Sequence, residues 1–373
     1  MQRDLHLRHG FSRVINARGT FTPLGVSRSS QQVREAVAAA LGEFLVVDEL
    51  IAAVSREAAQ ATGAQAATVF HCAAAGITLA VAAAMTGSDP QRIAALPDAT
   101  GMPDRVVLPA GHAVDYGHPI VTDIRLAGAT PVLAGTRAAC GMDHLERALA
   151  HEATACLLLV SSRLVDGAEV DLVQAVAAAH RRGVPAIIDG AAQDLRLGPL
   201  LDTGADLVVL SAQKYLAAPT AGLVVGRSDL VQACRAQDRG IGRAMKATKE
   251  AVVGVLAALQ ERRQLDLVEW SARQQRKLDG FIGRVGSLAG IDASVIPDPT
   301  GLPFARACLS VNAAVAPCDA AALSRQLRAG DPSIWLMDQE AVAGRLFLEL
   351  VPLDDDEIDV ILDRLATLLA NHP

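Results

Sequence analysis

Short apolar segments alternate along the chain with longer segments in which apolar residues recur every three or four positions. The short segments are unbroken and rich in valine, isoleucine and leucine, which is typical of buried strands, whereas the longer ones have a helical period. Strands are expected at residues 66–72, 105–108, 130–133, 155–160, 185–188 and 206–210, and helices at 73–85, 142–151 and 171–180. This alternation predicts an α/β fold, with a mostly parallel sheet covered by helices on both faces.

The two ends of the chain differ from this alternating centre. Residues 14–25 mix turn-forming and polar residues without a helical period, so an extended segment is expected there. Helices are expected at 31–41, after a pair of capping serines, and at 48–62, before Gly63. A long helix is predicted to run to about residue 285 and to lead into a smaller α+β domain.

The smaller domain has its own predicted elements. Strands are expected at 307–311 and 345–351, and helices at 319–329 and 355–369. The acidic run at 354–357 is interpreted as a helix N-terminus matched to its dipole, and not as a metal site. The predicted parts are an N-terminal segment with a helix (1–50), a large domain (51–250), and a linking helix with the small C-terminal domain (251–373).

Composition narrows the class of protein further. Apolar residues make up 51% of the chain and charged residues 20%, which is typical of a compact enzyme. The net charge of −7 does not indicate the excess of basic residues that is typical of nucleic-acid-binding proteins. The six cysteines are scattered without a CxxC pair, and the first residues lack the apolar core of a signal peptide. The apolar run at 73–85 is too short to span a bilayer. We expect a cytoplasmic protein that binds neither nucleic acid nor membranes.

Lys214 is the candidate for covalent chemistry. It follows the apolar run at 206–210, where a predicted strand passes into a turn, and it is one of only four lysines in the chain. Because arginine carries nearly all of the basic charge, a lysine here suggests chemistry that guanidinium cannot perform. A deprotonated amine that forms a Schiff base is such chemistry. The alternative is a lysine that extends from a strand end to solvent.

Asp189 is the candidate partner of a cationic group. It ends the apolar run at 185–188 and precedes Gly-Ala-Ala, so its carboxylate is expected at the end of a buried strand, where it needs a partner. The protonated ring nitrogen of pyridoxal phosphate (PLP) would be such a partner, and the carboxylate would keep the ring cationic. Lys214 follows about 25 residues later, enough for one connection and one strand to bring both residues to one sheet edge. The alternative is an aspartate that caps the next loop.

The segment that begins at Ala73 is a candidate phosphate site. A predicted strand passes there directly into a helix through small residues. The unpaired N–H groups of a first helical turn and the helix dipole favour an anion, and Thr78 offers a hydroxyl one turn further on. Alanine-rich helices are common in this chain, so the alternative is an ordinary packed helix.

Two further segments have two interpretations each. Asn16, Thr20 and Thr22 are either turn residues or a polar strip that lines a site. Arg243 and two lysines in the segment 240–250 form either a solvated basic face or a group of which one member reaches a phosphate, on the neighbouring subunit of a dimer.

Motifs spread over nearly the whole chain indicate a family. They are residues 15–20 (Ile-Asn-Ala-Arg-Gly-Thr), 48–50 (Asp-Glu-Leu), 73–76 (Ala-Ala-Ala-Gly), 84–87 (Ala-Met-Thr-Gly), 111–117 (Gly-His-Ala-Val-Asp-Tyr-Gly), 188–193 (Ile-Asp-Gly-Ala-Ala-Gln), 211–214 (Ser-Ala-Gln-Lys), 240–250 and 330–332 (Gly-Asp-Pro). Together they resemble the PLP-dependent enzymes of aspartate-aminotransferase fold (fold type I). Within these, the chain resembles the selenocysteine-synthase-like group that includes D-glucosaminate-6-phosphate ammonia-lyase.

The resemblance implies roles for individual residues. Lys214 would form the internal aldimine with PLP, and Asp189 would pair with the pyridine nitrogen. The backbone amides of three alanines would hold the phosphate, and His112 would lie near the face of the ring. The expected cofactor-binding residues are Ala73, Ala74, Ala75, His112, Asp189, Gln193, Ser211 and Lys214.

The sequence departs from the family's pattern in two places. Val351 stands where relatives often carry an arginine for the substrate carboxylate, and residues 161–163 (Ser-Ser-Arg) replace a histidine-rich strand end. Either another arginine binds the carboxylate, or the carboxylate is bound differently. The candidate arginines are Arg18, Arg163, Arg243 and Arg345, and the candidate substrate-binding residues are Asn16, Thr22, Arg163 and Arg243.

The expected function is that of a PLP-dependent ammonia-lyase acting on a β-hydroxy amino acid or an amino-sugar acid. Lys214 would remove the Cα proton, the β-hydroxyl would leave, and the released enamine would hydrolyse to a 2-oxo acid and ammonia. One alternative is a PLP-dependent transferase, either an aminotransferase or a β-replacement enzyme like selenocysteine synthase. Another is a protein of the same fold with a binding role and no activity. A homodimer or higher homo-oligomer is expected.

Overall fold

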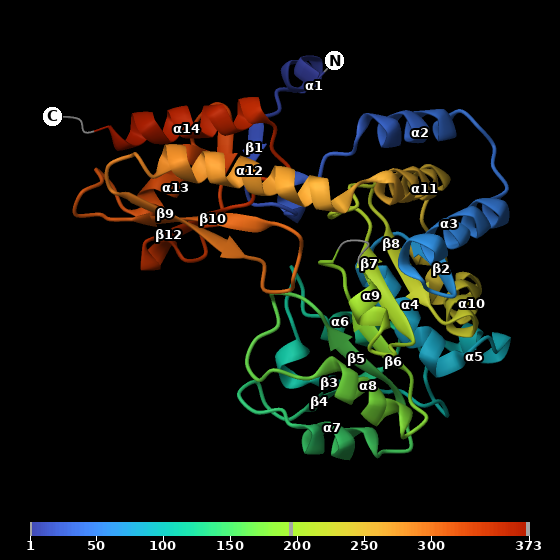
Figure 1. The fold of residues 1–373 in the computed structure, drawn as a ribbon. Coiled ribbons are helices and arrows are strands. Elements are labelled where there is room, and N and C mark those ends of the chain that lie inside the picture. The colour runs from blue at the N-terminus through green and yellow to red at the C-terminus, as the bar shows by residue number, and fades with distance from the viewer. Residues whose placement is uncertain (1, 194–196, 371–373) are drawn as a thin grey trace. The chain divides into compact units, whose positions relative to one another are not determined.

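The computed structural model describes residues 2–193 and 197–370 (Figure 1). Two compact units can be distinguished. One consists of residues 29–264, and the other of residues 1–28 together with 265–373. The boundaries of these units differ from those expected at residues 50 and 250, and the division into three parts stays a prediction.

The unit of residues 29–264 is built on a seven-stranded sheet with the strand order β2-β8-β7-β6-β5-β3-β4. Its strands are β2 (Ala66–Phe70), β3 (Arg105–Pro109), β4 (Thr130–Ala134), β5 (Thr154–Val160), β6 (Ala186–Asp189), β7 (Leu207–Ser211) and β8 (Gly222–Gly226). Neighbouring strands are parallel except at β8, which runs antiparallel to both β2 and β7. The predicted mostly parallel α/β sheet is therefore confirmed.

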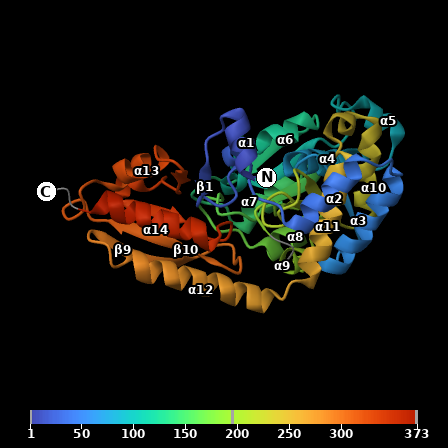
Figure 2. The same cartoon turned by 90° about the horizontal axis from the view of Figure 1, so that it is seen from above.

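Helices cover both faces of this sheet. Successive strand residues point to opposite faces, so each strand contributes side chains to two apolar cores. Leu157 and Leu159 lie in one apolar core and Leu158 in the other. Each of these leucines is fully buried, which stabilises the fold by roughly 1.5–3 kcal/mol per side chain. One core contains residues of α3 (Val47–Thr62), α7 (Met142–Leu149), α8 (Leu172–His180) and α11 (Lys249–Gln264). The other contains residues of α4 (Ala73–Thr86), α6 (Val121–Leu126) and α10 (Ser228–Ala236). These helices are labelled in Figures 1 and 2.

The remaining elements of this unit are short or peripheral. Helix α2 begins after Ser30, whose hydroxyl accepts a hydrogen bond from the Val33 N–H, as the capping serines predicted. Gly63 ends α3 in the left-handed conformation, also as predicted. The other segments are α2 (Gln31–Leu41), α5 (Pro90–Ala95), α9 (Gly198–Leu201), η2 (Ala110–His112), η3 (Gln237–Arg239) and η4 (Ile241–Met245).

The other unit is an α+β layer. An antiparallel sheet with the order β12-β10-β9 and a parallel pair of β1 with β11 share an apolar core with the helices. Its strands are β1 (Val14–Asn16), β9 (Ile291–Pro297), β10 (Ala305–Val311), β11 (Ser333–Trp335) and β12 (Arg345–Leu348). Its helices are α1 (Gln2–His9), η1 (Thr22–Leu24), α12 (Leu267–Val285), α13 (Ala320–Arg328), η5 (Ala341–Ala343) and α14 (Asp355–Leu369).

Several predicted elements need correction. The single long helix to residue 285 is wrong: α11 ends at Gln264 and α12 begins at Leu267, because the Asp266 carboxylate caps a new helix by accepting from the N–H groups of the next turn. Helix α1 and strand β9 were not predicted, and β12 ends at Leu348, short of residue 351. The interpretation of the acidic run as a helix N-terminus is confirmed, since Asp354 and Glu357 form a capping box at the start of α14.

Within the described residues, every helix is too short or too polar to cross a membrane. The same residues contain no group of three or more histidines, cysteines, aspartates or glutamates that would hold a metal ion.

Candidate active site

The carboxyl ends of the parallel strands meet along one edge of the seven-stranded sheet. The strand register places Asp189 of β6 beside Val160 of β5 and Val209 of β7. The turn that contains Lys214 follows β7, and β6 and β7 are neighbours. Because ligands of such sheets bind beyond the carboxyl ends of the strands, the catalytic site is expected among the loops that follow the parallel strands.

Asp189 is almost completely buried, with 5% of its surface exposed. One carboxylate oxygen accepts a hydrogen bond from the Ala191 N–H at 2.8 Å, and the other has no hydrogen-bond partner among the described residues. Burial raises the pKa of Asp189, while the Ala191 N–H and the positive charge of Lys214 lower it. A buried carboxylate with one oxygen unused fits a protonated ring nitrogen, which would supply both a donor and a compensating charge.

Lys214 lies in a tight turn directly after β7. Its N–H donates to the Ser211 carbonyl at 3.1 Å, and its own carbonyl accepts from the Ala217 N–H at 3.0 Å. Burial lowers the pKa of the Lys214 amine, the charge of Asp189 raises it, and the charge of Arg163 lowers it further. A lowered pKa keeps a fraction of the amine deprotonated, which both a Schiff-base former and a proton acceptor require.

His112 ends η2, the turn after β3, and only 2% of it is exposed. Its Nδ1 accepts a hydrogen bond from the Val160 N–H at 2.9 Å, so we assign the ring proton to Nε2. Burial lowers the pKa of His112 to about 4, which leaves the imidazole neutral at neutral pH. A neutral aromatic ring in a fixed orientation suits the predicted position against the face of a planar cofactor.

The first turn of α4 offers unused hydrogen-bond donors. Cys72 caps the helix and accepts from the Ala75 N–H through sulfur at 3.5 Å, whereas the N–H groups of Ala73 and Ala74 have no partner in the described part of the chain. Two unused amides at the start of a 14-residue helix fit a phosphate group. The suggested role of Thr78 is wrong, because its buried hydroxyl donates to the Asp123 carbonyl at 3.1 Å.

The other predicted residues of this unit occupy different environments. Gln193 is buried, and its amide donates to Ser161 Oγ at 3.2 Å. Ser211 is buried at the end of β7, where its carbonyl holds the Lys214 turn. Arg163 is exposed in the loop after β5, and its charge acts on Lys214. Arg243 is exposed in η4.

Asn16 and Thr22 lie in the other compact unit, where both belong to local turns. The Asn16 side chain donates to the Gly19 carbonyl at 2.8 Å and accepts from the Arg18 N–H at 3.0 Å, and Thr22 begins η1. Arg18 forms an ion pair with Asp338 at 2.8 Å. These contacts favour the interpretation of Asn16 as a turn residue, and the proposed substrate contacts of Asn16 and Thr22 stay predictions.

The remaining departures from the family's pattern also lie in that unit. Arg345 forms an ion pair with Glu340 at 2.5 Å, which occupies its charge locally. Val351 is half-buried in the turn that follows β12.

Three residues near the site escaped the sequence analysis. The Tyr116 hydroxyl donates to the carboxylate of the buried Asp123, and His118 Nε2 lies 2.9 Å from the other oxygen of that carboxylate. Tyr116 is one of only two tyrosines and lies in the motif 111–117, which was the available signal. Nothing in the sequence connects it to Asp123.

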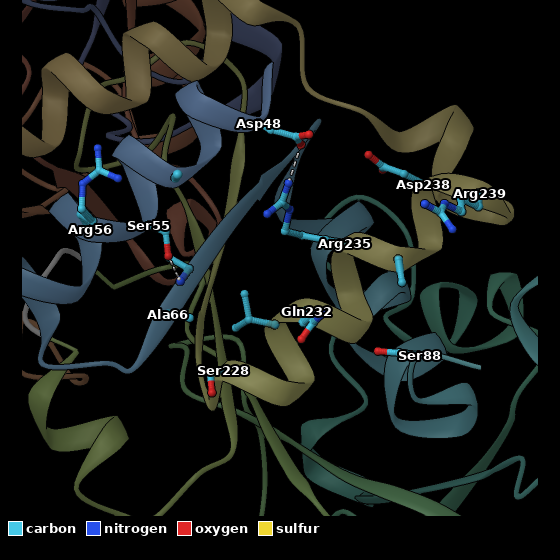
Figure 3. Close-up of a pocket in the computed structure, with 14 residues that line it drawn as sticks. Asp48, Ser55, Arg56, Ala66, Ser88, Ser228, Gln232, Arg235, Asp238 and Arg239 are labelled. Carbon is cyan, nitrogen blue, oxygen red and sulfur yellow. Dashed lines mark hydrogen bonds and ion pairs between the residues drawn. The ribbon is translucent and has the colours of Figure 1, made fainter. Parts of the chain in front are cut away.

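A cavity of about 790 Å³ opens elsewhere in the same unit, between α3, β2 and α10 (Figure 3). Asp48 and Arg235 form an ion pair of 2.8 Å within it, and Arg56, Asp238 and Arg239 also line it. None of the predicted site residues does so. The cavity is therefore separate from the candidate active site.

A half-buried lysine and a buried aspartate at the ends of neighbouring parallel strands, beside a helix N-terminus with unused amides, define a PLP-dependent enzyme of fold type I. No family model matches the chain. A D-glucosaminate-6-phosphate ammonia lyase of Salmonella typhimurium is 33% identical over 372 residues, which is 100% of this chain and 99% of that protein. A solved structure of D-glucosaminate-6-phosphate ammonia-lyase has a TM-score of 0.89 at 34% identity, with full coverage of both chains. The chain belongs to this family of PLP-dependent enzymes.

Two further similarities bear on the range of this family and on its fold. A 5′-C-glycyluridine monooxygenase-decarboxylase of Streptomyces sp is 36% identical over 366 residues, which is 97% of this chain and 91% of that protein. Serine palmitoyltransferase of Sphingomonas wittichii has a TM-score of 0.58 at 15% identity, covering 95% of this chain and 86% of that one, and this likeness concerns the fold alone.

Proposed function

We propose that this protein is a PLP-dependent ammonia-lyase that acts on a β-hydroxy amino acid or an amino-sugar acid. The observation that carries the proposal is the pairing of Asp189 and Lys214 at one sheet edge, in a chain similar over its full length to an ammonia-lyase. When bound, PLP supplies a sink for the electrons of the substrate's Cα–H bond.

Asp189 and Lys214 divide the proton chemistry between them. The unused oxygen of Asp189 would accept a hydrogen bond from the protonated ring nitrogen and so keep the ring cationic. The deprotonated Nζ of Lys214 takes the Cα proton, and burial favours this neutral form of the amine. The Ala73 and Ala74 amides would bind the phosphate and hold the cofactor in place.

The atoms of the net reaction balance without an oxidant. The Cα proton moves to Lys214, and the β-hydroxyl leaves with a proton as water. The resulting enamine takes up a water molecule and splits into a 2-oxo acid and ammonia. The substrate therefore loses ammonia overall and the water returns.

Arg163 is the arginine that we propose for the substrate's carboxylate or phosphate. Its charge acts on Lys214, which none of the other candidate arginines is seen to do. An exposed arginine in the loop after β5 offers planar, bidentate donors to such an anion.

A second candidate function rests on the similarity to the monooxygenase-decarboxylase, which is as extensive as that to the ammonia-lyase. Such a reaction consumes dioxygen and releases carbon dioxide, so the two candidates differ in their products. A transferase differs from both, because it needs an amino acceptor.

One assay separates these reactions. The purified protein, loaded with PLP, is incubated with β-hydroxy amino acids and with D-glucosaminate 6-phosphate. Ammonia, 2-oxo acid, dioxygen and carbon dioxide are measured with and without a 2-oxo acid acceptor. We expect equal amounts of ammonia and 2-oxo acid, independent of acceptor and dioxygen. Product formation that requires dioxygen and releases carbon dioxide would favour the second candidate, and dependence on the acceptor would indicate a transferase.

We also propose that copies of the chain associate into a homodimer or a larger homo-oligomer. The end of the connection between α2 and α3 and the first residue of α3 expose consecutive apolar side chains. Phe44 is fully exposed, and Leu45, Val46 and Val47 are at least one third exposed. An exposed apolar segment of this kind is typical of a protein interface. Light scattering is expected to give at least twice the chain's mass of 38.8 kDa, and a Phe44→Ser variant is expected to shift the equilibrium towards monomer.

A further inference from the structure

Cys72 determines which amides in the first turn of α4 stay available to a phosphate. Its carbonyl oxygen accepts a hydrogen bond from the Gly76 N–H at 3.0 Å, and its sulfur accepts from the Ala75 N–H at 3.5 Å. Among the described residues, the N–H groups of Ala73 and Ala74 are the ones of this turn left without a partner. Because Ala73 is bonded directly to Cys72, the place of the Cys72 backbone also sets the place of these two amides.

Gly222 begins β8 and lies directly against this backbone. It is buried, and a Cβ atom at this position would overlap the Cys72 carbonyl group and lie 2.7 Å from the Ala73 nitrogen. Real Cβ atoms essentially never approach other heavy atoms within 3.0 Å. The N-terminus of α4 can therefore occupy its position only because residue 222 has no side chain.

Gly76 allows a close approach from the side of the helix. Helix α4 packs against β7 and β8, and a Cβ atom on Gly76 would lie 3.0 Å from Val209 Cγ1 and 3.2 Å from Val224 Cγ2. These are side-chain atoms, so the demand is milder here than at Gly222, where backbone atoms stand in the way. Neither Gly76 nor Gly222 has a positive φ, so the lack of a side chain, and not the backbone conformation, is what requires glycine.

Gly222 also connects the phosphate end of the candidate site to its lysine end. In the sheet register it pairs with Phe70 of β2 and with Ser211 of β7. The strand of Phe70 leads into α4, and the Ser211 carbonyl accepts a hydrogen bond from the Lys214 N–H at 3.1 Å. Gly222 is thus the residue of β8 that lies between the strand leading into α4 and the strand leading into the Lys214 turn.

We propose that Gly222 and Gly76 are positioning residues that hold the free amides of α4 at the distance from Lys214 that fits the phosphate ester of PLP, an inference that rests on the proposed function. The cofactor is held at two ends, by its aldehyde carbon at Lys214 and by its phosphate at the amides. A shift of α4 away from the sheet weakens the phosphate contacts and leaves the lysine in place. The two glycines therefore favour PLP over pyridoxal, which has the same ring and aldehyde but no phosphate.

The test compares the affinities of the protein for PLP and for pyridoxal. Bound cofactor is removed, and both dissociation constants are measured from the absorbance of the Lys214 aldimine for the wild type, Gly222→Ala and Gly76→Ala. Gly226→Ala is the matched control, because a Cβ atom on Gly226 would overlap the Asp206 backbone carbonyl at the opposite end of the same strand. Circular dichroism and urea unfolding establish whether each variant is folded.

We expect Gly222→Ala to weaken PLP binding by about tenfold to a hundredfold, the range for the loss of one hydrogen bond to a charged group. Its affinity for pyridoxal is expected to change by less than about threefold. Gly76→Ala is expected to weaken PLP binding by about threefold, because valine side chains adjust more readily than backbone. Gly226→Ala is expected to be less stable than the wild type and to keep its preference for PLP.

A purely structural role for Gly222 predicts equal losses of affinity for PLP and for pyridoxal. Equal losses in a folded Gly222→Ala variant would overturn the inference, as would an unchanged affinity for PLP. If Gly222→Ala does not fold, an unchanged preference for PLP in Gly76→Ala would overturn it.

If pyridoxal forms no aldimine even with the wild type, the dissociation constant of PLP decides, and equal losses in Gly222→Ala and Gly226→Ala would overturn the inference. A wild-type protein that binds no PLP would instead overturn the proposed function, so the two failures are distinguishable.

Discussion

Acid titration of His112 gives a prediction whose size follows from the structure. Only 2% of His112 is exposed, and its Nδ1 accepts a hydrogen bond from the Val160 N–H, so protonation would both bury a charge and remove a hydrogen-bond acceptor. The pKa of this imidazole falls from 6.5 to about 4 on folding. A depressed folded-state pKa contributes stability that is present above pH 6.5 and is lost as the pH falls towards 4.

The magnitude follows from proton linkage. Between about pH 8 and about pH 5 the unfolded chain protonates this histidine and the folded chain does not, which costs about 2 kcal/mol of unfolding free energy. The assay is urea unfolding of the PLP-free protein at both pH values, for the wild type and His112→Phe. We expect the variant to lose about 2 kcal/mol less than the wild type on acidification. It should also be less stable near pH 8 by roughly 1–3 kcal/mol, because the Val160 N–H loses its acceptor.

His180→Phe is the control for this measurement. His180 is partly exposed, and its ring faces Asp206, which lies at the end of β7 opposite Lys214. Its replacement therefore measures the effect of losing a different histidine while the candidate active site stays unchanged. An acid response of His112→Phe equal to that of the wild type, within about 0.5 kcal/mol, would refute the assignment of a buried neutral imidazole.

Three further substitutions test the site itself. Lys214→Ala is expected to lower turnover by roughly a factor of 10²–10⁴ or more and to abolish borohydride fixation of the cofactor, whereas near-normal turnover would remove Lys214 from its role. Asp189→Asn is expected to cost about 3–5 kcal/mol of interaction with the ring, or roughly a hundredfold or more in turnover. Asp206→Asn, at an equally buried aspartate, should reduce stability without this loss, and similar turnover in the two variants would count against the electron-sink role. Arg163→Met is expected to raise KM about tenfold or more through loss of a charged hydrogen bond, while Arg345→Met should leave KM unchanged. An unchanged KM in Arg163→Met would indicate that another residue binds the substrate's carboxylate.

The central sheet could be predicted from the sequence because its strands are buried on both faces. Residues 155–160 and 206–210 are unbroken apolar runs, and the structure has strands at both. A residue that follows such a run within a few positions lies at the carboxyl edge of the sheet whatever the detailed packing. This is why Asp189 and Lys214 could be placed together before any geometry was known.

Other features depend on contacts that no local pattern encodes. The break between α11 and α12 has no glycine or proline to mark it, and it depends on the Asp266 side chain turning back to cap the next turn. The Thr78 hydroxyl was assigned to a phosphate because its partner, the Asp123 carbonyl, is distant in sequence.

The most direct test of the account is to reduce the PLP-loaded protein with borohydride, digest it and identify the labelled peptide by mass. The account predicts a coloured protein that fixes the cofactor on Lys214. A colourless protein that takes up no PLP, or a label on Lys246, Lys249 or Lys277 in place of Lys214, would contradict it.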